Sequence, residues 1–361
     1  MQKNRYKYII IGGGLSGLTS AFQFKLSNET NVKVLEARNV LGGRVHTKSG
    51  IDLGATWLHH DHTSIFSLLE HLKLEKYRQF NSGDSFYTAY SGAPVQTFHA
   101  DPKEVPSYRI KGGTHALIKA LAEQLMDWIE LETVVEKIIG EGDCLIVKTN
   151  KGEFKAEQVI VTVPPRLAST IKFQPNLPNN VLEAMQTTHT WFSHAIKVGL
   201  TFDAPFWRNQ GKSGMVIGAA GELTELYDHS NEEGTVFSLM GFAHENLRDT
   251  NPEEQEKKIV DYIAQFLGEE VLDYQEFFIQ DWSKEQFITG EIGIHPQRNT
   301  AYGNPVFQKS YLNGKLHFSG TETSRVQGGY LEGAVHRGLS LAQELRSTES
   351  KSGDGAAGKA H

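Results

Sequence analysis

The chain has 361 residues, of which 39% are hydrophobic and 22% are charged, and its formal net charge is −7. This length is natural for two domains with substantial cores, and the composition is that of a globular protein. Because no long run of Lys or Arg occurs, we expect no binding of nucleic acid or of an anionic membrane surface. We also expect no secretion signal and no membrane-spanning helix, since no apolar stretch reaches the ~20 residues that a bilayer requires.

The chain contains one cysteine, Cys144, so no disulfide can form within it. This fits a reducing compartment, and we expect a cytoplasmic protein. Cys144 stands in the strand-like run 143–147, where a small buried core residue is the expected role. The sequence does not indicate an oligomeric state.

The N-terminal segment has the pattern of a βαβ unit. Residues 7–11 predict a short buried strand, residues 16–26 predict a helix, and residues 32–35 predict a second strand that ends at Glu36. The loop after the first strand reads Gly12-Gly13-Gly14-Leu15-Ser16-Gly17, which is a G-x-G-x-x-G pattern. A strand before this loop, a helix after it and an acidic residue about 20 positions later together predict a dinucleotide site.

The residue types of this loop suit that ligand. Gly12 permits a tight turn, Gly14 removes a side chain where a pyrophosphate must approach, and Gly17 lets the helix and the strand pack closely. The helix N-terminus supplies N–H groups and the positive end of its dipole. Glu36 is expected to accept hydrogen bonds from the ribose hydroxyls. The loop alone does not distinguish NAD from FAD.

The rest of the chain mixes two patterns. Runs at 158–163 and 316–319 and a helix at 333–345 predict a return to the nucleotide-binding sheet. Amphipathic helices are predicted at 114–129, with Thr114 as N-cap, and at 252–267, between the caps Asn251 and Gly268. Four further strands, typical of a second and sheet-rich domain, are predicted at 195–202, 215–217, 223–227 and 236–241. Residues 347–361 lack periodicity and are expected to form a disordered tail.

These elements predict an α/β fold with a doubly wound, Rossmann-like domain and an inserted α+β domain. The first domain is expected to comprise residues 1–60, 108–170 and 283–346. The inserted domain is expected to comprise residues 61–107 and 171–282.

Several motifs occur in a fixed order from Glu36 to the last predicted helix. They are Glu36-Ala37-Arg38 with Gly42-Gly43-Arg44, Asp52-Leu53-Gly54-Ala55-Thr56-Trp57, Lys111-Gly112-Gly113-Thr114, Val161-Thr162-Val163-Pro164-Pro165, Gly320-Thr321-Glu322 and Gly329-Tyr330-Leu331-Glu332-Gly333-Ala334. In this order the chain resembles the flavin-containing amine oxidase family, the relatives of monoamine oxidase and polyamine oxidase. The resemblance spans almost the whole chain and implies that the first domain binds FAD.

The resemblance also implies roles for individual residues. Arg38, Gly43 and Arg44 would hold phosphate and ribose, Val135 would meet adenine through its backbone, and Glu322 would face the ribitol side. The other cofactor-binding residues implied are Ala37, Gly54, Ala55, Thr56, Trp57, Trp282, Gly320, Tyr330 and Leu331. The N-terminus of the last helix would stabilise the anion that forms when flavin accepts a hydride.

Three residues are candidates for catalysis. Lys197 interrupts an apolar strand, and a buried ammonium needs a partner or a function. By the resemblance it would hold a water against flavin N5, whereas the alternative is a lysine on the solvated face of an edge strand. Tyr330 would form one aromatic wall beside the substrate nitrogen, or merely pack over the cofactor. His59 would lie near the substrate amine, although a solvated or capping histidine is the default, and the run 59–62 has no metal-site spacing.

The chain also departs from the family pattern. Glu291 or a neighbour stands where covalent members have a cysteine, so FAD is expected to bind noncovalently, and Ile292 stands near the position of a second cage aromatic. Trp57 replaces the arginine that amino acid oxidases use for the substrate carboxylate, with Arg166 and Arg325 as the conceivable substitutes. The segment between His59 and Lys111 and the whole inserted domain are short, which favours an open site.

The expected reaction is FAD-dependent oxidation of a primary or secondary amine to an imine, which water hydrolyses to a carbonyl, while oxygen is reduced to hydrogen peroxide. The expected partners are thus a small-molecule amine and oxygen. One alternative is desaturation of a C–C bond, as in protoporphyrinogen oxidases and carotenoid desaturases. Another is a flavin-binding module without turnover. Lys197 and the 329–333 motif favour the amine reaction.

Overall fold

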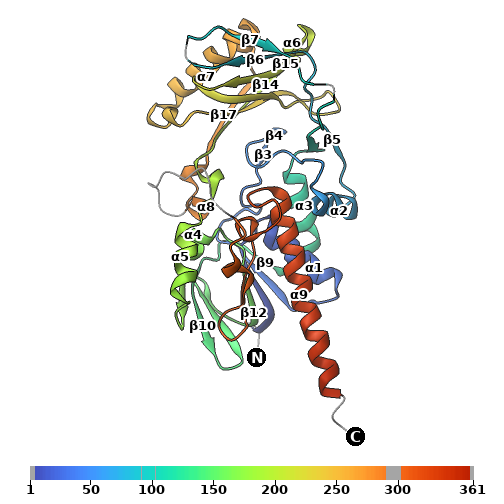
Figure 1. The fold of residues 1–361 in the computed structure, drawn as a ribbon, viewed down its shortest axis with the longest axis vertical. Coiled ribbons are helices and arrows are strands. Elements are labelled where there is room, and N and C mark those ends of the chain that lie inside the picture. The colour runs from blue at the N-terminus through green and yellow to red at the C-terminus, as the bar shows by residue number, and fades with distance from the viewer. Residues whose placement is uncertain (1–4, 91, 102, 290–301, 358–361) are drawn as a thin grey trace.

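The computed structural model describes residues 5–90, 92–101, 103–289 and 302–357. Within these ranges the molecule is elongated, with an eight-stranded sheet toward one end and a seven-stranded sheet toward the other (Figure 1). The chain crosses between the sheets several times, so each domain is assembled from separated segments. No helix of the described ranges is both long enough and apolar enough to cross a membrane.

The eight-stranded sheet is built around the strand that precedes the glycine loop. β1 pairs in parallel with β2 on one side and with β12 on the other, and Tyr8, Ile9 and Ile10 are fully buried. Burial on both faces is typical of a parallel sheet that helices cover. The strands are β1 (Arg5–Ile11), β2 (Val32–Leu35), β9 (Ile129–Glu130), β10 (Val135–Glu141), β11 (Cys144–Thr149), β12 (Gly152–Val161), β13 (Lys172–Gln174) and β19 (Leu316–Phe318).

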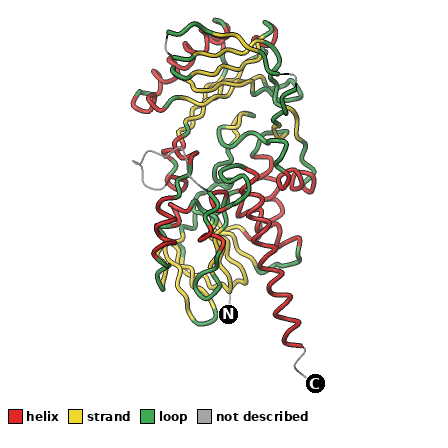
Figure 2. Tube along the Cα trace, viewed as in Figure 1, coloured by secondary structure: helices red, strands yellow, loops and turns green. Residues whose placement is uncertain are grey.

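Helices pack on both faces of this sheet. α1, α3 and α9 share one core with β1, and Figure 2 shows them as a red layer beside the yellow strands. α1 and α9 approach closely because Gly338 lacks a side chain, and a Cβ there would lie 2.6 Å from Ser16 O. α4 and α5 share the core of the other face. The helices are α1 (Leu15–Leu26), α2 (Thr63–His71), α3 (His115–Leu125), α4 (Pro165–Ala168), α5 (Asn179–Thr187) and α9 (Leu331–Ala357).

The second sheet has the order β18-β14-β17-β16-β15-β6-β7, and α7 covers one of its faces. Asn251 Oδ1 accepts from Glu254 N (2.9 Å), and Gly268 ends α7 with φ +109°, which confirms both predicted caps. The elements are β6 (Asp84–Thr88), β7 (Gln96–Phe98), β14 (Ile196–Phe202), β15 (Lys212–Gly218), β16 (Leu223–Asp228), β17 (Phe237–Ala243), β18 (Glu276–Asp281), α6 (Phe206–Asn209) and α7 (Pro252–Leu267).

Two small ribbons lie between the domains: β3 (Thr47–Lys48) with β4 (Ile51–Asp52), and β5 (Lys76–Arg78) with β8 (Tyr108–Ile110). The β3–β4 ribbon packs against the second sheet. Ile51 lies so close to Gly199 that a Cβ on this glycine would be 2.8 Å from Ile51 Cγ2. Ile51 and Leu53 also share a small core with Met240 and Phe278. The ribbon therefore fixes the first domain against the face of the sheet that α7 leaves free.

The α/β fold class is confirmed, but three details differ from the expectation. α2 packs against α9, and β13 and α5 belong to the first domain, so the predicted boundaries at 61 and 171 come too early. The expected tail from 347 is helical as far as Ala357, since no proline interrupts α9. Thr114 occupies the N-cap position of α3, but its hydroxyl donates to Asp52 Oδ1 (3.0 Å) and Ala55 O (2.9 Å) and does not cap the helix.

Candidate active site

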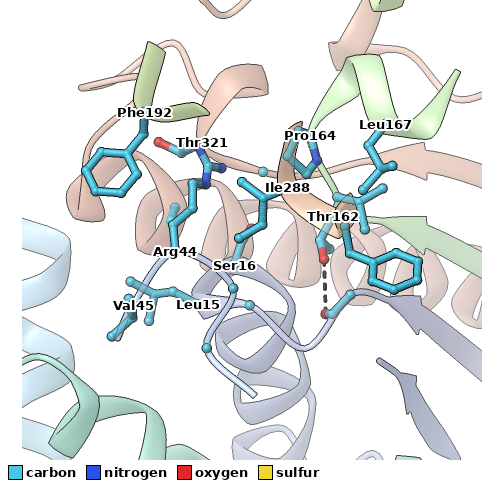
Figure 3. Close-up of a pocket in the computed structure, with 18 of the residues that line it drawn as sticks. Leu15, Ser16, Arg44, Val45, Thr162, Pro164, Leu167, Phe192, Ile288 and Thr321 are labelled. Atoms are coloured by element: carbon cyan, nitrogen blue, oxygen red, sulfur yellow. Dashed lines mark hydrogen bonds between the residues drawn. The ribbon is translucent and has the colours of Figure 1, made fainter. Parts of the chain in front are cut away.

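A cavity extends from the glycine loop to the free face of the second sheet. Figure 3 shows part of its lining, with Leu15 and Ser16 at the start of α1, Arg44 near Thr321, and Thr162, Pro164 and Leu167 around the end of β12. Most of the predicted site residues line it: Gly12, Gly14, Glu36, Ala37, Arg38, Gly43, Arg44, Gly54, Ala55, Thr56, Trp57, Val135, Lys197, Gly320, Tyr330 and Leu331. Residues about 300 positions apart in the chain thus share one cavity.

The glycine loop has the geometry that a dinucleotide needs. Gly12 has φ +110°, a conformation that L side chains rarely adopt. At Gly17 a Cβ would lie 2.0 Å from Gly12 O, so this glycine serves the crossing of helix and strand and does not line the cavity. At Gly14 a Cβ would meet only Gly43 Cα, at 3.8 Å, which leaves free space beside the N-terminus of α1. The loop therefore fits a pyrophosphate.

Two acidic side chains fix the surrounding loops. Glu36 Oε2 accepts from Gly13 N (2.7 Å), and its Oε1 accepts from Arg38 N (2.9 Å), so the carboxylate joins the glycine loop to the next motif. Glu36 still lines the cavity, and carboxylate oxygens can accept further hydrogen bonds from a ribose.

Glu322 is buried behind the cavity and does not line it. Arg44 donates to both of its oxygens, with Nη1 2.6 Å from Oε1 and Nη2 3.1 Å from Oε2, and Thr190 Oγ1 adds a bond of 2.6 Å. Burial alone would raise the pKa of Glu322, but the bidentate Arg44 pair and the Thr190 bond hold it below its usual value. Glu322 thus orients Arg44, which lines the cavity.

Lys197 is fully buried at the other end of the cavity. Its Nζ donates to Asp52 O (2.9 Å), Gly54 O (2.9 Å) and Thr56 Oγ1 (2.7 Å). β14 is not an edge strand but lies between β17 and β18, so the alternative of a solvated edge lysine is wrong. Burial lowers the pKa of Lys197 to about 7, with Asp52 opposing this and Arg109 reinforcing it.

Aromatic side chains surround this lysine and the cavity mouth. Lys197 Nζ lies 4.9 Å from the Phe242 ring centre and 5.5 Å from that of Trp57. Tyr330 and Trp191 line the cavity although they are 47% and 45% exposed, which indicates an open mouth. Trp191 Nε1 donates to Gly329 O (3.3 Å), directly before Tyr330.

The sequence interpretation missed Trp191 and Phe242. Trp191 belongs to none of the ordered motifs, and Phe242 is opposite Lys197 on a neighbouring strand, a pairing that periodicity does not reveal. Further lining residues were missed because they lie in loops and short helices between the motifs: Val45, Thr170, Ile171, Phe192, Phe287 and Ile288.

Besides Gly17 and Glu322, two further predicted residues stand behind the cavity and do not line it. The His59 ring makes edge-to-face contacts with Tyr330 (ring centres 6.1 Å apart) and with His62 (5.0 Å), so it supports the tyrosine. Trp282 donates from Nε1 to Leu53 O (2.7 Å) and braces the segment that carries Gly54. The described residues contain no group of three potential metal ligands. Glu291 and Ile292 lie outside the described residues.

The arginines that line the cavity are Arg38 and Arg44, both at the dinucleotide end. Arg166 contacts His189 (3.3 Å), and Arg325 is exposed, and neither lines the cavity. In the described part of the chain, the lining around Lys197 therefore offers no guanidinium for a substrate carboxylate.

Comparison with known proteins identifies relatives over almost the whole chain. The family model for flavin-containing amine oxidoreductases matches residues 15–107 and 95–346. A probable flavin-containing monoamine oxidase A of Dictyostelium discoideum is 22% identical over 94% of this chain and 97% of its own. The flavin-containing amine oxidase A of Equus caballus is 25% identical over 96% and 86%. A solved structure of putrescine oxidase bound to putrescine has a TM-score of 0.83, with 21% identity over 95% of this chain and 99% of that chain.

The alignment to the Dictyostelium protein spans 448 positions, which exceeds the 361 residues of this chain. Segments of that relative therefore have no counterpart here. This agrees with the short second domain expected from the sequence and with the half-exposed aromatic residues at the cavity mouth.

The two glycines of the loop predict opposite outcomes when each is changed to alanine. Gly14→Ala is expected to leave the unfolding midpoint almost unchanged and to weaken FAD binding by about a hundred-fold, since the methyl group occupies the pyrophosphate space. Gly17→Ala is expected to destabilise the fold itself, because its methyl group collides with Gly12 O. Urea unfolding of the FAD-free proteins and fluorescence titration with FAD measure both. Equal FAD affinities for Gly14→Ala and the unchanged protein would contradict the assignment.

Proposed function

The chain belongs to the family of flavin-containing amine oxidoreductases, and on that premise we propose that it oxidises a primary or secondary amine with FAD as cofactor and oxygen as acceptor. Bound FAD would supply the redox chemistry, which is acceptance of a hydride from the α-carbon of the amine and transfer of the electrons to oxygen, with hydrogen peroxide and an imine for hydrolysis as products. The residues of this chain bind and orient both partners. The observation that carries the proposal is the buried Lys197 ammonium at the cavity wall beside the Gly54–Trp57 segment.

Lys197 Nζ is suited to move a proton near neutral pH. With a pKa of about 7, both its charged and its neutral forms are populated there. Its three hydrogen bonds use all three N–H donors of the ammonium and fix Nζ in one position. We assign to Lys197 the task of supplying a proton while oxygen is reduced.

The start of α9 supplies the electrostatic part of the site. Tyr330 precedes the helix and Leu331 begins it, and both line the cavity. The free N–H groups and the positive dipole end of this first turn stabilise negative charge that develops beside them. Tyr330 presents an exposed ring on which the substrate amine can be oriented.

FAD is proposed to bind noncovalently. The only cysteine of the sequence, Cys144, is buried in β11 and does not line the cavity. Acid precipitation should therefore release all flavin into the supernatant; flavin that stays with the pellet would contradict noncovalent binding.

A diamine is favoured over a monoamine by the position of Glu225. Lys197 pairs with Phe242 across the sheet, and Phe242 pairs with Glu225, so the three residues form one row on the same face, and Lys197 and Phe242 of this row line the cavity. Adjacent strands lie ~4.8 Å apart, which places Glu225 roughly 10 Å from Lys197. In the described residues Glu225 has no ion pair and accepts one hydrogen bond, from Tyr227 Oη (3.1 Å). Its carboxylate can bind the distal ammonium of a diamine such as putrescine, the compound bound in the related oxidase structure.

Lys197→Met is expected to slow reoxidation of the reduced flavin by oxygen roughly a hundred-fold, because the proton donor is lost while the volume is kept. Anaerobic mixing with amines, followed by stopped-flow mixing with oxygen, separates the two half-reactions. Lys257→Met, on the exposed side of α7, is the matched control and should behave as the unchanged protein. Failure of amines, diamines and polyamines alike to bleach the flavin would refute the proposed function.

Glu225→Gln is expected to lower kcat/KM for putrescine ten- to a hundred-fold and to leave kcat/KM for butylamine within about two-fold, since only the diamine carries a second charge. Glu276→Gln, at an exposed position of β18, makes the same charge change away from the cavity and should alter neither value. An unchanged ratio of the two substrates in Glu225→Gln would eliminate Glu225 as the distal anchor without affecting the amine oxidase assignment.

A further inference from the structure

Asp52 connects the two domains through its main chain as well as its side chain. It is fully buried at the end of β4, and its carbonyl oxygen accepts from Lys197 Nζ (2.9 Å). On the other side of the same residue, its backbone N–H donates to His229 Nε2 (3.0 Å). His229 follows β16 in the second sheet. One residue of the first domain is thereby held between two residues of the second.

His229 acts as a fixed neutral acceptor. Because Nε2 accepts a hydrogen bond, the imidazole proton must reside on Nδ1. Burial lowers the pKa of His229 to about 3, and the nearby Arg109 charge reinforces that shift. His229 therefore fixes the Asp52 backbone without adding a charge beside Lys197.

The Asp52 carboxylate, by contrast, carries its charge inside the protein. Its Oδ1 accepts from Thr47 Oγ1 (2.6 Å), Thr114 N (2.9 Å) and Thr114 Oγ1 (3.0 Å). Burial raises the pKa of this carboxyl, whereas the Arg109 charge and the Thr47 hydrogen bond lower it. We therefore treat Asp52 as the anion of this cluster.

Arg109 on β8 is the opposing charge. Arg109 is 2% exposed, and its guanidinium donates to Ser230 O (3.0 Å) and lies 5.2 Å from the ring centre of Tyr77. Arg109 and Asp52 act on Lys197 with opposite signs, because the cation disfavours a second positive charge and the anion favours it. Among the described residues, Glu225 is the other charged group that acts on Lys197, and it acts in the same direction as Asp52.

We propose that Asp52 and Arg109 are positioning residues for Lys197: Asp52 fixes the Nζ atom through its carbonyl, and the two opposed charges together set how readily the lysine holds its proton. Neither Asp52 nor Arg109 lines the cavity, so both residues act through Lys197 and not on the substrate. The functional consequence rests on the proposed role of Lys197. The electrostatic part does not, and it can be measured without turnover.

The measurement is the titration of Lys197 in protein labelled with ¹³Cε-lysine, in the resting oxidised state. The Lys197 resonance is the one that disappears in Lys197→Met. Asp52→Asn keeps the shape and the Oδ1 acceptor but removes the anion, so the Lys197 midpoint should move down by about one pH unit. Arg109→Gln removes the cation, and the midpoint should move up by about the same amount. Arg109→Lys, which keeps the charge, should restore a value close to that of the unchanged protein.

The double variant Asp52→Asn with Arg109→Gln provides the second arm, because two opposed charge effects on one group should cancel and return the midpoint to near its original value. The pH profile of flavin reoxidation should follow the same order as the titrations. If Asp52→Asn fails to fold, the contrast between Arg109→Gln and Arg109→Lys still decides the sign.

The proposal is overturned if Lys197 titrates near the ordinary lysine value in the unchanged protein, if both single variants shift it in the same direction, or if neither shifts it by more than about 0.3 unit. A lysine titration that behaves as expected in a protein whose flavin no amine reduces would retain this electrostatic assignment and refute the amine oxidase function. The two failures are thus distinguishable.

Discussion

The burial of one ammonium group governs how the two domains meet. An uncompensated charge in the interior is expensive, and Lys197 lies on the second sheet with no carboxylate bonded to it. Its three acceptors all belong to the segment 52–56 of the first domain. The lysine is therefore satisfied only when that segment is seated against β14. The same segment forms a wall of the cavity, so the contact that resolves the buried charge also places the cavity against the second sheet.

The packing around this joint allows little displacement. Gly199, two residues after the lysine, has no side chain because Ile51 occupies that space. Trp282 reaches across to Leu53 O from the end of β18. The apolar contact of Ile51, the indole N–H of Trp282 and the ammonium of Lys197 thus fix the successive residues 51–54 from the same side. Sites built on such rigid elements keep their geometry better than sites on free loops.

The parts of the molecule that the sequence predicts well are those determined by near neighbours in the chain. The glycine loop needs only β1, α1 and the acidic end of β2, and its glycines have the expected geometry. The caps of α7 are equally local. Lys197 was only partly predictable. Its strand follows from the local pattern, but the position of that strand inside the sheet does not, because strand order depends on β17 and β18, which follow Lys197 by 40 residues or more.

The unpredicted residues depend on pairings that no local pattern encodes. Arg44 and Glu322 are 278 positions apart, although each stands in a motif. Because the two side chains form a bidentate pair, Glu322 supports Arg44 and does not itself line the cavity. Thr114 has the residue type of a cap, yet the buried Asp52 carboxylate attracts its hydroxyl more strongly than the end of α3 does. A charged acceptor in the interior outweighs a local preference worth about 1 kcal/mol.

The same carboxylate links these observations to the chemistry. Asp52 collects hydrogen bonds from Thr47 and Thr114 in the first domain, and it meets His229 from the second. Such a buried anion would be destabilising without Arg109, and the two charges act on the adjacent lysine in opposite directions. Burial is the main influence on Lys197 and holds its pKa at about 7. The polar cluster at the domain joint thus has a cost in desolvation that an apolar joint would avoid. It provides a lysine that can exchange a proton near neutral pH.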